Sequence, residues 1–321
     1  RNMINYGQGA IRCQPYVLSE QPAAQLDDEA AAVTAFDKAL FGHIGFAISN
    51  FFRTFWLSLS GGVFSTAPYS DATAKYYKQM NRFSAALALM SDVAMGTLGG
   101  DLKRRERISA RLGDILSMLY LTSAVLKRFN DEGRKADDLP LVQWCCEDNL
   151  AKAQLALDEL FDNFPNRIVG TVLKRVVFPW GRTLRKASDV TEHKVARIMQ
   201  TPGEARSRLG HHLYLKNEPL NQLGRMEQAL KDVLAAEPVF DKVSHAAGKR
   251  LPFYRLNEVA DLGLELKVIS EAEAKLLRDA EQGRLFAINV DDFEPEYLAA
   301  DKTLTQQGAG AVEKDKKDKA A

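Results

Sequence analysis

Apolar residues recur every three or four positions along most of the chain. The clearest run extends from Phe36 to Leu59 and stops at Gly61 and Gly62. That spacing places apolar side chains along one side of an α-helix. Three similar runs follow before Pro165, so the sequence predicts four long amphipathic helices.

Helix start and stop signals set the expected boundaries. The second helix follows Pro68, with Asp71 as its candidate N-cap, and ends at Gly99 and Gly100. The third follows Asp101 and closes at 130–133; the fourth begins at Leu139 and ends before Pro165. Because long helices joined by short loops are typical of antiparallel bundles, residues 36–165 are interpreted as a helical bundle.

Shorter helices are expected over residues 166–302. They are predicted at Ile168–Phe178, Asp189–Gln200, Gly224–Ala236, Leu256–Leu266 and after Ser270. Ser270 and Glu273 have the spacing of a capping box. No segment shows the alternation of apolar and polar residues that is typical of a β-strand, so the predicted fold class is all-α. Residues 303–321 are rich in Gly, Ala, Lys and Asp, and this composition predicts a disordered tail.

Bulk composition narrows the classes of function. The 321 residues carry a net charge of +1, which argues against nucleic acid as a partner. The three cysteines, Cys13, Cys145 and Cys146, form neither a disulfide nor a zinc pattern, and we expect them to be reduced in a cytoplasmic protein. The polar start lacks a signal peptide, and Arg1 is not an initiator methionine, so we expect a fragment.

Few residues suggest chemistry. The glycines of 6–9 lack the strand and the third glycine of a nucleotide-binding turn, and a helix start or kink is the favoured interpretation. The adjacent pair His211–His212 lacks a further ligand at helical spacing, so a metal site is disfavoured. His43 is interpreted as a hydrogen-bonded core or rim residue, and His193 and His245 carry no signal.

Two features suggest contacts with anions or membranes. The first is the basic run Lys103–Arg107 with Arg111, which is either a solvated face or an anion site. The second is a pair of aromatic-rich segments. The stripe within 36–59 is favoured as bundle core, and its charges argue against a spanning helix. For Ile168–Trp180, which mixes aromatic and basic residues, core and membrane-surface interpretations are equally weighted, making it the better membrane candidate.

Several stretches resemble one enzyme family. The string Arg1–Cys13 resembles the end of the catalytic region of long bacterial acyl-CoA dehydrogenases of fatty-acid β-oxidation, the FadE type. Other stretches resemble the C-terminal region of the same enzymes: Phe36–Gly45, Leu98–Leu116, Asp137–Val142, Asn163–Arg167 and Ile288–Phe293.

The resemblance implies a flavoenzyme that oxidises acyl-CoA to 2-enoyl-CoA. A glutamate removes the α-proton, FAD accepts the β-hydride, and an electron-transfer flavoprotein takes the electrons. In the family this glutamate lies in a Glu-Gly-x-Asn segment just ahead of the arginine that Arg1 matches. Glu20 follows that motif and is not promoted to base, so we assign no catalytic, cofactor-binding or metal-binding residue in this chain.

By the same resemblance, residues 1–20 are the end of the catalytic helical domain, 21–35 a linker, and the remainder an appended domain. Such extensions are associated with subunit or membrane contacts. We therefore expect a docking segment that is inactive alone, cytoplasmic and peripheral to the inner membrane, with a homodimer as one arrangement. The alternative is a self-standing helical adaptor or membrane-surface module without enzymatic activity.

Overall fold

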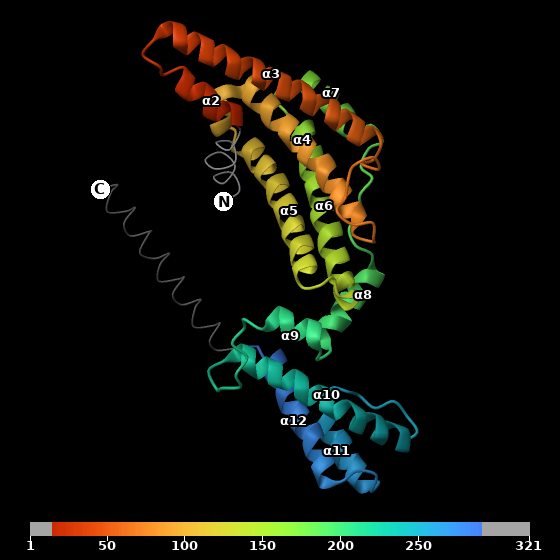
Figure 1. The fold of residues 1–321 in the computed structure, drawn as a ribbon. Coiled ribbons are helices and arrows are strands. Elements are labelled where there is room, and N and C mark those ends of the chain that lie inside the picture. The colour runs from red at the N-terminus through yellow and green to blue at the C-terminus, as the bar shows by residue number, and fades with distance from the viewer. Residues whose placement is uncertain (1–14, 291–321) are drawn as a thin grey trace, which may run out of the picture. The chain divides into compact units, whose positions relative to one another are not determined.

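The structure is a computed structural model that describes residues 15–290, and all the regular elements in this range are helical (Figure 1). The all-α prediction is confirmed. The chain divides after Leu209 into two compact units, and each is described by itself.

The first unit contains the four predicted long helices, preceded by the short helix α2 (Pro15–Ala23). The long helices are α3 (Glu29–Leu59), α4 (Ala74–Leu98), α5 (Glu106–Asp131) and α6 (Leu139–Asp162). Helix α3 begins at Glu29, inside the segment predicted as a linker, because the Asp28 side chain caps the Ala30 amide. It ends where Gly61 and Gly62 take positive φ values of 59° and 79°.

Helices α4, α5 and α6 form the hydrophobic core of this unit together with α7 (Arg167–Val177). The side chains that are fully buried there include Phe83, Met90, Leu112, Ile115, Leu157 and Leu160. Helix α7 approaches α6 closely at Gly170. The unit continues beyond the predicted bundle boundary at residue 165, through α8 (Asp189–Gln200) and most of α9 (Glu204–Gly210).

Two predicted helix starts differ from the structure. The third helix was predicted to follow Asp101, but Gly99–Lys103 forms the 3₁₀ helix η3, and α5 begins only at Glu106. The turn is held because Leu102 is buried and its carbonyl accepts a 2.8 Å hydrogen bond from Ser109 Oγ. The N-cap of α4 is Thr73, whose amide donates to Asp71 Oδ1 at 2.9 Å, so Asp71 precedes the cap.

The second unit contains α10 (Gln222–Ala246), α11 (Leu256–Glu265) and α12 (Glu271–Ile288). Its own hydrophobic core includes Val243, Leu256, Val259 and Leu277. The helix predicted at Gly224–Ala236 continues through Pro238, because Val239, Phe240 and Val243 keep one side of α10 in the core. The Ser270–Glu273 capping box is present at the start of α12, as predicted.

Candidate functional site

Helix α3 exposes most of its large apolar side chains. These residues, the outer face of α3, are 37% to 69% exposed: Phe41, Ile44, Ile48, Phe51, Phe52, Phe55, Trp56 and Leu59. Single exposed apolar residues are ordinary, but a continuous row on one helix marks a surface that binds something. The interpretation of this stripe as bundle core is wrong.

The opposite side of α3 is buried and carries polar groups. Asn50, Thr54 and Ser58 lie one helical turn apart and are 5%, 0% and 0% exposed. Within residues 15–290, Asn50 Nδ2, Thr54 Oγ1 and Ser58 Oγ have no hydrogen-bond partner. An amphipathic helix of a water-soluble protein has the reverse arrangement, with apolar residues inside and polar residues outside. Helix α3 is therefore inverted in this sense: its apolar side is exposed and its polar side is buried.

Helix α7 and the turn after it extend this apolar surface. The Trp180 indole Nε1 donates a 3.0 Å hydrogen bond to the Leu59 carbonyl, joining the turn to the end of α3. Ile168, Val172 and Trp180 are exposed. We call these three residues together with the outer face of α3 the α3–α7 surface.

Only part of the segment Ile168–Trp180 contributes to this surface. Its other apolar residues belong to the core of the first unit: Leu173, Val176, Val177 and Phe178. Phe178 packs edge-on against Phe161 at a ring distance of 5.8 Å. The core interpretation of this segment therefore holds for one of its sides, and the other side is exposed.

Cations accompany the α3–α7 surface. Arg53 is the only Asp, Glu, Lys or Arg between Ala39 and Leu59. Arg167 and Arg175 lie on α7 beside Ile168 and Val172, and both are exposed.

The neighbouring carboxylates, Asp158 and Asp162, are paired with Lys174. The Lys174 Nζ lies 2.8 Å from Asp158 Oδ1 and 2.7 Å from Asp162 Oδ1. The hydrogen bonds to Asp158 and then Asp162 raise the pKa of Lys174. Lys174 therefore bridges both acids, and Arg182 Nε lies 3.6 Å from Asp158 Oδ2 as a second cation.

By length and composition alone, two helical segments of the described chain could cross a membrane. They are Glu29–Leu59 and Ala74–Lys103. In the second, 44% of the apolar window is buried, as expected for a core helix, whereas α3 exposes most of its large apolar side chains. The charges that were counted against a spanning first helix therefore do not exclude one.

His43 forms a polar junction between three helices. Its Nδ1 lies 2.9 Å from Glu20 Oε1 on α2, and its Nε2 lies 3.5 Å from Asp92 Oδ1 on α4. The imidazole also stacks on the Tyr16 ring at 5.5 Å and 7°. The interpretation of His43 as a hydrogen-bonded rim residue is confirmed. Neither carboxylate partner was identified from the sequence, because no spacing rule links α2 or α4 to His43.

The basic run surrounds the N-terminus of α5. Arg105 is the N-cap position, and Glu106 and Arg107 are the first two residues of the helix, so the acidic Glu106 lies among cations that the helix dipole disfavours. Arg104 lies 3.8 Å from Asp101, and Arg111 lies 3.5 Å from Glu159. The arrangement resembles a solvated face with partial pairing.

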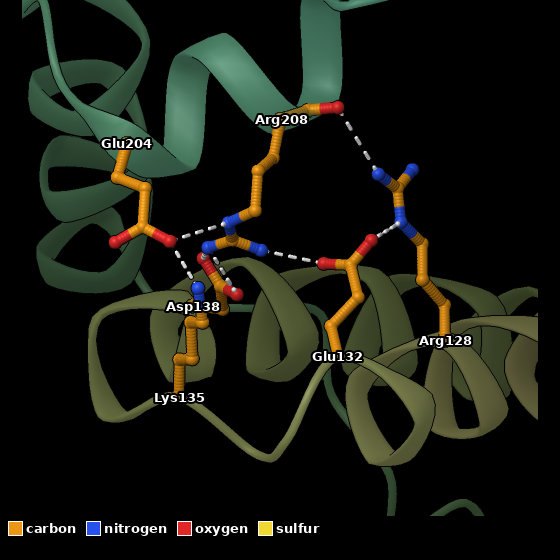
Figure 2. Close-up of polar contacts among 6 residues, drawn as sticks. All are labelled: Arg128, Glu132, Lys135, Asp138, Glu204 and Arg208. Carbon is orange, nitrogen blue, oxygen red and sulfur yellow. Dashed lines mark hydrogen bonds and ion pairs between the residues drawn. The ribbon is translucent and has the colours of Figure 1, made fainter.

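A network of ion pairs fastens α9 to the turn between α5 and α6 (Figure 2). Arg208 contacts Glu132 and donates to both oxygens of Asp138 at 2.9 and 2.8 Å. Lys135 pairs with Glu204, and Arg128 Nε donates to Glu132 at 2.8 Å. Every charged group in Figure 2 has an opposite partner, which is typical of a structural clamp.

The remaining candidates do not gather into a site. The rings of His211 and His212 lie 3.6 Å apart and are tilted by 41°, and within residues 15–290 no three His, Cys, Asp or Glu side chains are grouped as metal ligands. His193 and His245 are exposed. Burial raises the pKa of the Cys146 thiol to about 12. The glycines of 6–9 lie outside the described residues.

Comparison with known families agrees with the resemblance. The family model "Acyl-CoA dehydrogenase, C-terminal, bacterial type" matches residues 11–293. No solved structure matches the chain significantly. Because the match covers most of the sequence, this chain belongs to the bacterial-type acyl-CoA dehydrogenase C-terminal family.

Proposed function

We propose that this chain is the docking part of an FAD-dependent acyl-CoA dehydrogenase that converts acyl-CoA to trans-2-enoyl-CoA in the first step of fatty-acid β-oxidation. The enzyme passes its electrons to an electron-transfer flavoprotein. The docking part holds it on the cytoplasmic side of the inner membrane through the α3–α7 surface. The observation that carries the proposal is the inversion of α3, with aromatic residues outside and Asn50, Thr54 and Ser58 inside.

The size of the apolar row supports a membrane contact. An amphipathic helix that lies in the membrane plane buries its apolar side in the boundary between headgroups and acyl chains. Burying about half of each exposed side chain contributes roughly 1 kcal/mol per residue. Eight such residues on α3 supply several kcal/mol, comparable with the roughly 8 kcal/mol of a micromolar association.

The flavin is assigned elsewhere in the enzyme, because the grooves described in this chain do not fit it. The groove of about 400 Å³ beside α7 is lined by several charged residues, including Asp158, Asp162 and Arg167. In the second unit, a groove contains Phe240 and Phe253, whose rings pack edge-on against each other at 72° rather than in parallel. We derive no step of catalysis from these residues.

Vesicle flotation with the full chain tests the proposal. Phe41, Phe52 and Trp180 are exposed, so changing all three to Ser leaves the core intact. We expect the triple variant to bind vesicles on the order of 100-fold more weakly, from roughly 1 kcal/mol per side chain.

The matched control changes exposed apolar residues outside the surface, Tyr120→Ser with Leu220→Ser. The control should bind like wild type. Unchanged binding of the triple variant, or equal losses in both variants, contradicts the assignment of the α3–α7 surface.

A second candidate, pairing with another copy of the chain, is favoured by one observation. Phe41, Ile44, Ile48, Phe51 and Phe55 follow the alternating three-and-four spacing of a helix–helix seam. Sedimentation without vesicles separates the two functions. A dimer lost in the triple variant, together with no flotation of wild type, would favour pairing over the membrane.

A further inference from the structure

The arginines of α7 are placed among its exposed apolar residues. Arg175 lies three residues after Val172 and seven after Ile168, so all three side chains share one side of the helix. Arg167 precedes Ile168 in the chain and lies at the edge of this side. A bound apolar surface that covers Ile168 and Val172 would therefore meet these guanidinium groups as well.

These arginines have no ion pair in the described chain. Within residues 15–290, Arg53, Arg167 and Arg175 are absent from the ion pairs, whereas the acids beside α7 are held by Lys174. Arg182 is also engaged, at 3.6 Å from Asp158. Arg167 and Arg175 therefore add positive charge beside the exposed apolar residues of α7 that no ion pair within residues 15–290 offsets.

We infer that the α3–α7 surface selects membranes that carry anionic phospholipids, whose phosphate groups bind Arg167 and Arg175 while Ile168, Val172 and Trp180 enter the acyl boundary. The inference rests on the proposed membrane function and names the lipid class. One guanidinium group can donate two hydrogen bonds to the oxygens of a phosphate group. A membrane that contains anionic lipids also attracts each nearby cation.

The test compares the full chain on phosphatidylcholine vesicles and on vesicles containing about one third phosphatidylglycerol. Removing two cations with Arg167→Gln and Arg175→Gln should weaken binding to the anionic vesicles about 30-fold, from about 1 kcal/mol per cation. Binding to neutral vesicles should change little. Added salt should weaken the binding of wild type to anionic vesicles more than that of the double variant.

The control variant removes the same charge elsewhere. Lys249 and Arg250 are exposed in the second unit, and changing both to Gln should leave the binding unchanged. Equal binding of wild type to both vesicle types, or equal losses in the two double variants, overturns the inference and leaves the membrane function standing. Failure of wild type to bind either vesicle type overturns the membrane function itself.

Discussion

Gly170 is required where α7 meets α6. A Cβ atom added there would lie 2.5 Å from the Phe161 carbonyl oxygen and 3.1 Å from Phe164 Cβ. The carbonyl belongs to the backbone of α6 and cannot rotate away. We therefore expect Gly170→Ala to destabilise the first unit by about 1–3 kcal/mol, measured by chemical denaturation.

The matched control is Gly45→Ala on α3, where an added Cβ would meet nothing within 4 Å. It should be neutral or stabilise by up to about 1 kcal/mol, because alanine favours helix more than glycine. Equal effects of the two substitutions would contradict the close approach of α7.

Two equally buried threonines differ in their hydrogen bonds. Thr54 and Thr122 are both 0% exposed, but Thr122 Oγ1 donates to the Met118 carbonyl at 2.7 Å, whereas Thr54 Oγ1 has no partner within residues 15–290. Thr54→Val should raise the stability by about 1 kcal/mol, since it removes a desolvated hydroxyl. Thr122→Val should lower stability by a similar amount. Thermal unfolding of both variants measures the difference, and a loss of stability in Thr54→Val would argue against the polar inner side.

The contacts between individual side chains that are distant in the sequence were the least predictable part of the fold. The capping pair Ser270–Glu273 was predicted because its three-residue spacing is local. The contacts of His43 with Glu20 and Asp92 join three helices, so no local pattern encodes them. The same holds for Arg208, whose partners Glu132 and Asp138 lie about seventy residues earlier in the chain.

For a whole helix, periodicity predicts that an apolar side exists but not which way it faces. The stripe of α3 was therefore taken for core. Asn50, Thr54 and Ser58 repeat at four-residue spacing on the other side, which is the pattern that a water-soluble helix with a buried apolar side also has. The sequence pattern alone therefore did not show that the apolar side of α3 is the exposed one.

The Glu273 carboxylate should make the stability of the first turn of α12 depend on pH. The Glu273 carboxylate accepts hydrogen bonds from the Ser270 amide at 2.7 Å and from Lys242 Nζ at 2.9 Å. The bond from the Ser270 backbone, followed by that from Lys242, lowers the pKa of Glu273 to about 2. Because the folded pKa lies below the unfolded value of 4.5, this stabilisation is present above pH 4.5 and is lost as the pH falls toward 2.

Glu273→Gln tests this pH dependence, because the amide keeps the shape without the charge. Wild type should be more stable than the variant at neutral pH, and the difference should shrink below pH 4.5. Circular dichroism followed through thermal unfolding at a series of pH values measures it. A difference that stays constant with pH would show that the carboxylate charge does not stabilise α12.

At the scale of the molecule, the sequence predicted long helices followed by shorter ones but not the division into units. The change in helix length was predicted near residue 165, whereas the compact units divide after Leu209. The reason is that Leu173, Val176 and Val177 bury α7 in the core of the first unit. Such long-range packing is not visible in local periodicity.

The second unit has a hydrophobic core of its own, formed by α10, α11, α12 and the segments between them. We therefore expect residues 210–321, produced alone, to be helical and to unfold cooperatively in circular dichroism. Val243 is fully buried there, and Val243→Ala should destabilise this piece by about 1–3 kcal/mol. A piece that is helical but melts without cooperativity would show that its core depends on the rest of the chain.

The tryptophans are placed so that their fluorescence should report binding at the α3–α7 surface. The chain has three, and Trp56 and Trp180 are both on the α3–α7 surface, while Trp144 donates to Glu192 at 3.3 Å on another part of the first unit. Emission from an indole shifts to shorter wavelength when water leaves its surroundings. Contact with lipid or with a second chain would therefore change the native fluorescence, and bromine-labelled acyl chains would quench it only if lipid is the partner.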